Sequence, residues 1–160
     1  MTQGGRAVTS GNVLETTVEG TLRGHKYIEV GFDLPKKQRL ECLINSQSIP
    51  KRYAKQVYIG EGIYGNDIYV DFYIIGYTSI DSGLIIECKW QQTSGSVDEK
   101  LPYLNLNIQK CYPTKAVVLI DGGGMKAKAV SWLEAQVAEN HNLLAVHNLS
   151  SFLAWSNNNL

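Results

Sequence analysis

Three residues near the middle of the chain have types and spacing suited to hydrolytic chemistry. Glu87 and Lys89 lie two apart in the segment LIIECKWQ, and Asp71 lies in the preceding apolar segment DIYVDFYII. Both segments are rich in β-branched and aromatic residues, which favours two strands paired as a hairpin. Side chains two apart on a strand share a face, so Glu87 and Lys89 project together. If Asp71 lies across from Glu87, two carboxylates and one ammonium meet at one point.

Two interpretations of this cluster follow from its chemistry. One is a cross-strand salt bridge, which at a surface contributes less than about 1 kcal/mol. The other is a metal site, because two neighbouring carboxylates in apolar surroundings repel each other unless a cation joins them. Mg²⁺ binds through one or two carboxylates together with waters and substrate phosphates. Lys89 would then orient an attacking water or stabilise charge that develops on phosphorus.

The pattern of Asp71 followed by Glu87-Cys88-Lys89 resembles the signature of the PD-(D/E)XK nuclease superfamily, although Val70 stands where that signature has Pro. The expected order of elements over Gly11–Ile120 is similar to the αβββαβ core of that superfamily. The resemblance implies an α/β, restriction-endonuclease-like fold with a mixed central sheet flanked by helices. It also implies a Mg²⁺-dependent DNA endonuclease, in which Mn²⁺ can substitute. Asp71 and Glu87 would hold the metal, and Lys89 would assist the attacking water.

Other segments resemble parts of the same superfamily. Gly11–Glu15 (GNVLE) is similar to its Gly-xxx-Glu motif, which implies that Glu15 faces the active site, with Glu19 one turn later as the alternative. Gln91 matches a glutamine that lines the site in several small nucleases. The loop with Ser94 and Ser96 opens a helix whose backbone N–H groups suit a phosphate. Lys100 would neutralise the DNA backbone or pair with Glu99.

The charge of the chain is unevenly distributed. The formal net charge is zero, but residues 1–55 hold nine Lys/Arg against five Asp/Glu. Between residues 36 and 55 the basic side chains are opposed only by Glu41, so this stretch could contact phosphates or form a solvated face. Tyr53, Tyr58 and Tyr64 could stack on DNA or pack on a strand face. The candidate DNA-binding residues are Lys36, Lys37, Arg39, Lys51, Arg52, Lys55, Ser94, Ser96 and Lys100.

The periodicity of the chain predicts one domain over 11–160 after a flexible N-terminus at 1–10. The run Ala116–Ile120 has no polar alternation, which is typical of a strand covered on both faces. Turn residues separate most of the other segments. The predicted helices are Gly11–Leu22, Lys36–Ile44, Val97–Cys111, Met125–Glu139 and Ser150–Trp155. The predicted strands are Lys26–Val30, Gln56–Ile59, Asp67–Ile75, Leu84–Gln91, Ala116–Ile120 and Leu143–His147.

Composition excludes several classes of protein. The 160 residues are 44% apolar and 19% charged, as in an ordinary globular domain. No apolar run approaches the roughly 18 residues of a membrane span. The three cysteines have no CxxC spacing, which argues against a disulfide or zinc site. The N-terminus lacks the apolar core of a signal peptide, so we expect a cytoplasmic protein. The resemblance to restriction-type nucleases implies a bacterial, archaeal or phage origin.

The sequence leaves several functions open. We expect sequence-specific, restriction-type cleavage of duplex DNA by a homodimer, because one chain offers one active site and two strands need cutting. A structure-specific or homing nuclease, similar to a junction resolvase, is an alternative on the same fold. So is a non-catalytic DNA-binding protein. A nucleotide site at Asp121–Gly124 is the weakest candidate, because the segment lacks the P-loop pattern.

Overall fold

The computed structural model describes residues 3–77, 83–93, 95 and 98–160. Six strands of this described part form one sheet in the order β1-β2-β3-β4-β5-β6. The pairs β2–β3 and β3–β4 are antiparallel, whereas β1–β2, β4–β5 and β5–β6 are parallel. The sheet is therefore mixed, as predicted. The strands are β1 (Ile28–Glu29), β2 (Arg52–Glu61), β3 (Asp67–Ile75), β4 (Leu84–Trp90), β5 (Ala116–Asp121) and β6 (Leu143–His147).

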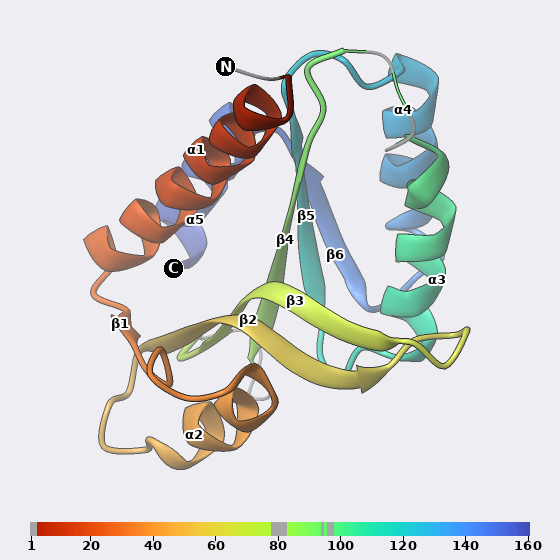
Figure 1. Ribbon diagram of the computed structural model, residues 1–160. Coiled ribbons are helices and arrows are strands. Elements are labelled where there is room, and N and C mark those ends of the chain that lie inside the picture. The colour runs from red at the N-terminus through yellow and green to blue at the C-terminus, as the bar shows by residue number, and fades with distance from the viewer. Residues whose placement is uncertain (1–2, 78–82, 94, 96–97) are drawn as a thin grey trace.

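Helices cover both faces of this sheet (Figure 1). Two of them, α1 and α5, lie on one face of β4–β6, and α3 and α4 lie on the other, while α2 packs against β2. The α/β fold with a mixed sheet between helices is thereby confirmed. The helices are α1 (Gln3–Gly24), α2 (Arg39–Asn45), α3 (Leu101–Lys110), α4 (Ala127–Gln136) and α5 (Leu149–Asn159), with 3-10 turns at Lys36–Gln38 and Asp98–Lys100.

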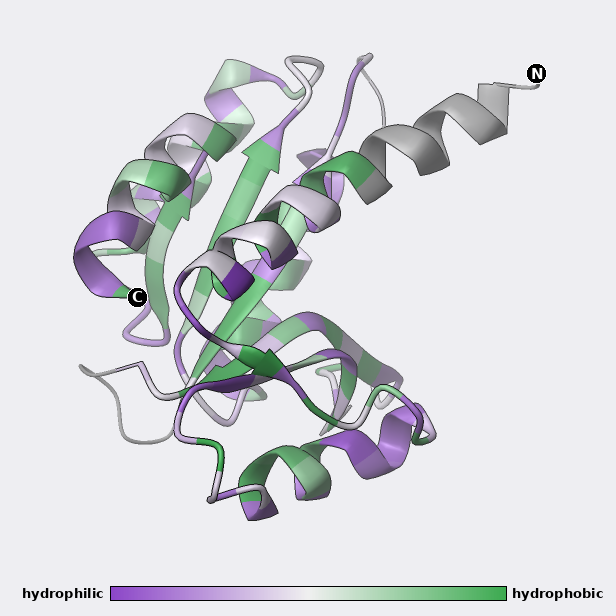
Figure 2. Cartoon of the chain, turned by 90° about the vertical axis from the view of Figure 1, so that its left-hand side faces the viewer, coloured by the Kyte–Doolittle hydropathy of each residue, from purple (hydrophilic) through white to green (hydrophobic). Residues whose placement is uncertain are grey.

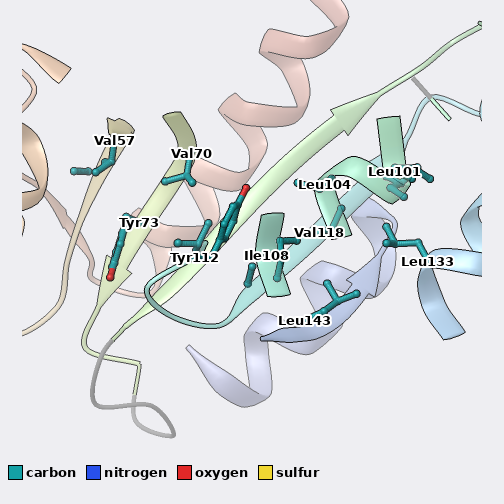
Figure 3. Close-up of a cluster of buried hydrophobic side chains, with 14 of the residues drawn as sticks. Val57, Val70, Tyr73, Leu101, Leu104, Ile108, Tyr112, Val118, Leu133 and Leu143 are labelled. Atoms are coloured by element: carbon teal, nitrogen blue, oxygen red, sulfur yellow. The ribbon is translucent and has the colours of Figure 1, made fainter. Parts of the chain in front are cut away.

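Alternation along β4 divides the core into two layers. Ile85 belongs to the layer that contains α3, shown in Figure 3 with Leu104 and Ile108. Ile86 belongs to the layer under α1 and α5. The strands between the helices are coloured as hydrophobic over most of their length in Figure 2. Because side chains two apart share a strand face, Glu87 follows Ile85 into the α3 layer and is buried there.

The strands β3 and β4 separate at the point where Asp71 and Glu87 stand. Pairing between them extends only from Ile74–Leu84 to Phe72–Ile86. Pairing of β3 with β2, in contrast, continues to Asp67 at the other end of the strand. The β2–β3 hairpin therefore curls away from β4 (Figure 1), and the described polar groups at the fork are free of the regular ladder.

Some predicted boundaries differ from the structure. The first helix begins at Gln3 instead of Gly11, so residues 3–10, expected as a flexible N-terminus, are helical. The second strand begins at Arg52 instead of Gln56, because a buried Arg52 and Tyr53 continue the pairing with β3. In the part of the chain that the structure describes, no helix is long and apolar enough to cross a membrane.

Candidate active site

Asp71 and Glu87 are in contact across the fork between β3 and β4. The backbone N–H of Asp71 donates to Glu87 Oε1 at 3.3 Å, and the backbone N–H of Cys88 donates to Asp71 Oδ2 at 2.8 Å. Each carboxylate thus accepts a hydrogen bond from the backbone of the opposite strand. The structure brings together the two acids that the hairpin pattern placed across from each other, while their chemical roles stay a prediction.

The Glu87 carboxyl is the most deeply buried acidic group of this cluster, at 3% exposure. Burial, together with the neighbouring Asp71 charge, raises the pKa of Glu87 to about 8. Lys89 Nζ lies 3.6 Å from Glu87 Oε2. Burial by itself would lower the pKa of Lys89, but the charges of Glu87 and Asp71 outweigh it and raise that pKa. One ammonium therefore serves two carboxylates.

Two residues complete the surroundings of the pair. The Tyr112 phenol, which follows α3, hydrogen-bonds to Glu87; burial first, and then the charges of Glu87 and Asp71, raise the pKa of this phenol. Burial and, after it, the negative charge of Asp71 raise the pKa of Glu15 on α1. Glu15 is thus close enough to Asp71 to sense its charge, and its place in the site, which the Gly-xxx-Glu resemblance implied, stays a prediction.

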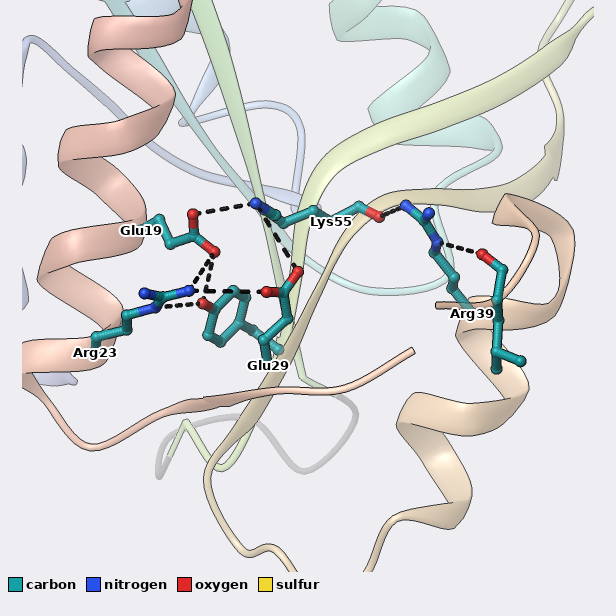
Figure 4. Close-up of polar contacts among 7 residues, drawn as sticks. Glu19, Arg23, Glu29, Arg39 and Lys55 are labelled. Atoms are coloured by element: carbon teal, nitrogen blue, oxygen red, sulfur yellow. Dashed lines mark hydrogen bonds and ion pairs between the residues drawn. The ribbon is translucent and has the colours of Figure 1, made fainter. Parts of the chain in front are cut away.

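Glu19, the alternative to Glu15, is already engaged elsewhere (Figure 4). It accepts hydrogen bonds from the Tyr53 phenol at 2.6 Å and from Lys55 Nζ at 3.1 Å. Arg23 and Glu29 extend this set, with Arg23 3.5 Å from Glu19 and 3.8 Å from Glu29. Although burial acts in the opposite direction, the hydrogen bonds from Tyr53 and Lys55 lower the pKa of Glu19. We call these five residues the Glu19 network; the partners of Glu19 hold it outside the Asp71 cluster.

Gln56 on β2 is a site residue that the sequence analysis missed. Its Nε2 donates to Asp71 Oδ1 at 3.1 Å. Gln56 has a φ of 51°, a left-handed conformation that side chains other than glycine seldom adopt. The flanking pairs Lys55–Phe72 and Val57–Val70 place it directly across from Asp71. Strained backbone at such a position is a frequent mark of a functional site, but nothing in a local sequence pattern reveals it.

Gln91 directly follows β4, and its hydrogen bonds fix the turn after β5. The side chain is 5% exposed, and its Nε2 donates to the Gly124 carbonyl at 3.2 Å. The Gly124 N–H in turn donates to the Gln91 carbonyl at 2.7 Å. Gly122 has a φ of 106°, and a Cβ there would lie 2.5 Å from the same carbonyl. The glycines at Asp121–Gly124 thus serve a tight connection.

Two of the candidate DNA-binding residues have structural partners instead. Arg52 is 6% exposed, and its guanidinium donates to the carbonyls of Leu43, Ile44 and Ile49 at and after the end of α2. Arg39 donates to the carbonyl of Lys55 at 2.7 Å (Figure 4) and to that of Leu34. The hydrogen bonds of both side chains tie α2 to β2, which gives each a structural role whether or not it contacts DNA.

The remaining basic candidates keep their ammonium groups at the surface. Lys36 and Lys37 lie over tyrosine rings of the β2–β3 hairpin, at 5.6 Å from the Tyr69 centroid and 4.7 Å from that of Tyr58. Lys37 also pairs with Asp67 at 3.1 Å. Lys51 donates to the His25 carbonyl, Lys55 belongs to the Glu19 network, and Lys100 borders a pocket beside Glu87. Ser94 and Ser96 lie outside the described residues.

The donor set suits a hard divalent cation. Within the described ranges no group of three or more His, Cys, Asp or Glu side chains has the geometry to hold a metal ion. The two carboxylates of Asp71 and Glu87 are nevertheless a frequent protein contribution to a Mg²⁺ site. Cys88 is unsuited as a ligand, because burial, followed by the Asp71 charge, raises the pKa of its thiol well above the ordinary value.

Comparisons with known proteins agree with this geometry. Neither curated proteins nor solved structures yield a match to the chain. A family model describing a PD-(D/E)XK nuclease superfamily domain, however, matches residues 6–160. This match includes most of α1, the fork between β3 and β4, and all six strands described above. The chain therefore belongs to the PD-(D/E)XK nuclease superfamily.

Proposed function

We propose that this protein is a metal-dependent endonuclease that hydrolyses phosphodiester bonds of DNA, with Asp71, Glu87 and Lys89 as its central residues. The observation that carries the proposal is the pair of adjoining acids at the fork of β3 and β4. There, Asp71 and the 3% exposed Glu87 have one ammonium between them, and burial together with Asp71 raises the pKa of Glu87 to about 8. Ionising both acids is costly for the fold unless a cation joins them.

Asp71 and Glu87 would hold the ion, with Mg²⁺ expected and Mn²⁺ as a substitute. A bound divalent ion supplies positive charge to a phosphate and makes a water more acidic. The Asp71 carboxylate is oriented for this task, because Gln56 donates to its Oδ1 and the Cys88 N–H to its Oδ2. Each oxygen retains a lone pair that can face the cation.

Lys89 would act as a fixed positive charge and hydrogen-bond donor. Its raised pKa keeps the ammonium protonated at neutral pH, so the lysine would orient the attacking water or contact a phosphoryl oxygen, and would not remove a proton. Glu15 would accept a hydrogen bond from water on the α1 side of the same site. Gln91 would support the site indirectly, through its hydrogen bond to Gly124.

The surface lysines would contact the DNA backbone. Lys36, Lys37, Lys51 and Lys100 are retained for this role, whereas the buried Arg52, the hydrogen-bonded Arg39 and Lys55, which pairs with Glu19 and Glu29, are left out. Binding through such contacts weakens steeply as salt concentration rises. Sequence-specific cleavage of duplex DNA by a homodimer is one form of the proposed activity. A structure-specific nuclease is another, and the pocket beside Glu87 favours it.

The test is digestion of supercoiled, linear and branched DNA in Mg²⁺, Mn²⁺ or EDTA. The wild-type protein is compared with Lys89→Ala and with Lys110→Ala, which changes an exposed lysine at the end of α3. We expect metal-dependent cleavage that Lys89→Ala abolishes and Lys110→Ala leaves intact. Discrete products would indicate a preferred sequence or structure. No metal-dependent cleavage of any of these substrates would overturn the proposal and favour a non-catalytic DNA-binding protein.

A further inference from the structure

A pocket of about 360 Å³ opens beside the two central residues of β4. Glu87 and Lys89 line it from one side, and Leu101 and Leu104 of α3 line it from the other. Its volume lies within the roughly 300–1,000 Å³ of pockets that hold small molecules or parts of them. The first half of β3 curls away from β4 (Figure 1), since their pairing ends at Phe72–Ile86, and residues of this half of β3 line the pocket opposite α3.

The walls of the pocket are apolar and aromatic, with few hydrogen-bonding groups. Ile68 of β3 faces the two leucines of α3, and Tyr103 and Tyr69 stand among the lining residues. Asn107 adds one carboxamide, whose Oδ1 accepts from the Ile63 N–H at 2.9 Å. Amide side chains are suited to the polar edge of a nucleobase. The apolar and aromatic walls are suited to the flat faces of the same base.

Tyrosines and lysines continue from the pocket onto the surface. Tyr64, 81% exposed, stacks on Tyr103 with ring centroids 5.2 Å apart and planes 18° from parallel. The Tyr103 phenol donates to Asn66 Oδ1 at 2.7 Å, which holds its ring in place. On the other side, Lys36 lies over the ring of Tyr69. Exposed rings with interleaved ammonium groups are the usual surface for single-stranded DNA, because bases stack on the rings and phosphates pair with the cations.

A fully paired duplex cannot use this pocket. Its bases are stacked on one another inside the helix, so a duplex phosphate at Lys89 would present only sugar and phosphate to the recess. An unpaired nucleotide next to that phosphate can place its base between Ile68 and the α3 leucines. The carboxylates of Asp67 and Glu87, which also line the pocket, do not repel a nearby phosphate, because Lys37 pairs with Asp67 and Lys89 with Glu87.

We infer that the pocket beside Glu87 and Lys89 receives an unpaired base, and that the substrate is DNA with a single-stranded segment next to the cleaved bond. This inference rests on the proposed nuclease function and specifies its substrate class. Tyr103 and Asn107 are the residues that would contact the base. Tyr64, Tyr69 and Lys36 would guide the adjoining nucleotides.

Binding is measured in the Asp71→Asn variant, because Asp71 does not line the pocket and the variant should leave the DNA uncut. The probes are a fluorescent forked DNA with two unpaired arms and a fully paired duplex of equal length. We expect the fork to bind at least about tenfold more tightly than the duplex, since each stacked base contributes substantially. Adding Tyr103→Ala should lower fork affinity by about tenfold and leave duplex affinity unchanged.

Two controls separate loss of stacking from loss of folding. Tyr103→Phe keeps the ring and should retain fork affinity within about threefold, as a neutral hydrogen bond contributes little. Trp132→Ala removes a 40% exposed aromatic ring of α4 that does not line the pocket, and should change neither affinity. Thermal unfolding of each variant confirms that it is folded at the assay temperature.

Cleavage by the wild-type protein distinguishes failure of this inference from failure of the proposed function. The inference is overturned if fork and duplex bind equally well, or if Tyr103→Ala leaves fork affinity unchanged. Cleavage of duplex DNA in that case would still support the proposed nuclease function. Fork binding that depends on Tyr103, without cleavage of any DNA, would support the pocket assignment and overturn the nuclease. Cleavage of forks at the junction, reduced by Tyr103→Ala, would support both.

Discussion

The Asp71 cluster and the Glu19 network use the same kinds of side chain but differ in charge balance. In the Glu19 network, the carboxylates of Glu19 and Glu29 face the cations of Arg23 and Lys55. At the fork of β3 and β4, Asp71 and Glu87 face a single ammonium, and Glu15 adds a third carboxylate nearby. The first set has as many cations as carboxylates, whereas the second would hold an excess of negative charge if its acids were all ionised, which is the basis for the proposed cation.

Burial sharpens the contrast between the two sets. Glu19 has a lowered pKa because its hydrogen bonds stabilise the carboxylate despite burial, whereas Glu87 has a pKa raised to about 8 because burial and Asp71 act together. A carboxylate that its neighbours hold in the charged form is typical of an ion pair that stabilises the fold. A carboxyl that its own fold makes unfavourable to ionise is typical of a site that functions with a partner.

The largest effect should come from removing one carboxylate of the unbalanced set. We expect Glu87→Gln to lower the rate of DNA cleavage by at least about a hundredfold, as loss of one charge-stabilising group does in other enzymes. Glu19→Gln should keep that rate within about threefold. Initial cleavage rates at saturating Mg²⁺ measure both variants. Equal losses of activity in the two would remove the functional distinction between the sets.

Mg²⁺ should stabilise the protein through Asp71 and Glu87. At a concentration a hundredfold above its Kd, a ligand of the folded state adds about 2.7 kcal/mol to the free energy of unfolding. For a chain of this size that corresponds to about 5–10 °C in Tm. Glu87→Gln should abolish this Mg²⁺-dependent rise in Tm. Without metal, the variant should have a higher Tm than the wild type, because it no longer buries an acid beside Asp71. Calorimetry with Mg²⁺ or EDTA measures this, and a Glu19→Gln variant that also lost the shift would contradict it.

Gln56 should matter through its hydrogen bond to Asp71. Gln56→Gly accepts the left-handed backbone at no steric cost but loses the amide, so the fold is retained. Groups that orient a metal ligand usually affect metal affinity or activity about tenfold or more. We expect the Mg²⁺ concentration for half-maximal cleavage to rise about tenfold. Lys26→Gly, at the other left-handed residue outside glycine in the described chain, is the matched control and should leave it unchanged.

The smallest effect should be the loss of stability when Glu19 of the Glu19 network is replaced. Glu19→Gln removes a charged acceptor from Tyr53 and Lys55, and we expect the free energy of unfolding to fall by about 1–2 kcal/mol. Urea denaturation measures the change. Glu41→Gln, on the exposed side of α2, is the control and should stay within about 0.5 kcal/mol of the wild type. A larger loss in the control would show that Glu19 is not special.

The local pattern of the chain predicted the hairpin well. The bounds of β3 and β6 are those predicted, and β4 ends at Trp90, one residue before the predicted Gln91. The alternation in LIIECKWQ was sufficient to place Glu87 and Lys89 on one face, because strand geometry depends on the nearest neighbours alone. The segment 31–55 was harder, since Arg52 and Arg39 reach backbone carbonyls up to sixteen residues away.

The residues of the chain already specify the family, the hairpin and the acids at its fork, because these depend on residue type and on spacing along one strand. The curl of β2–β3 away from β4 depends on packing among distant elements. That curl leaves room for the pocket between β3 and α3. Packing also gives Glu19 partners on β2, and the β2–β3 pairing places Gln56, in a left-handed conformation, beside Asp71. Three-dimensional packing alone distinguishes Arg52, whose guanidinium donates to buried backbone carbonyls, from Lys36, whose ammonium lies over the exposed ring of Tyr69.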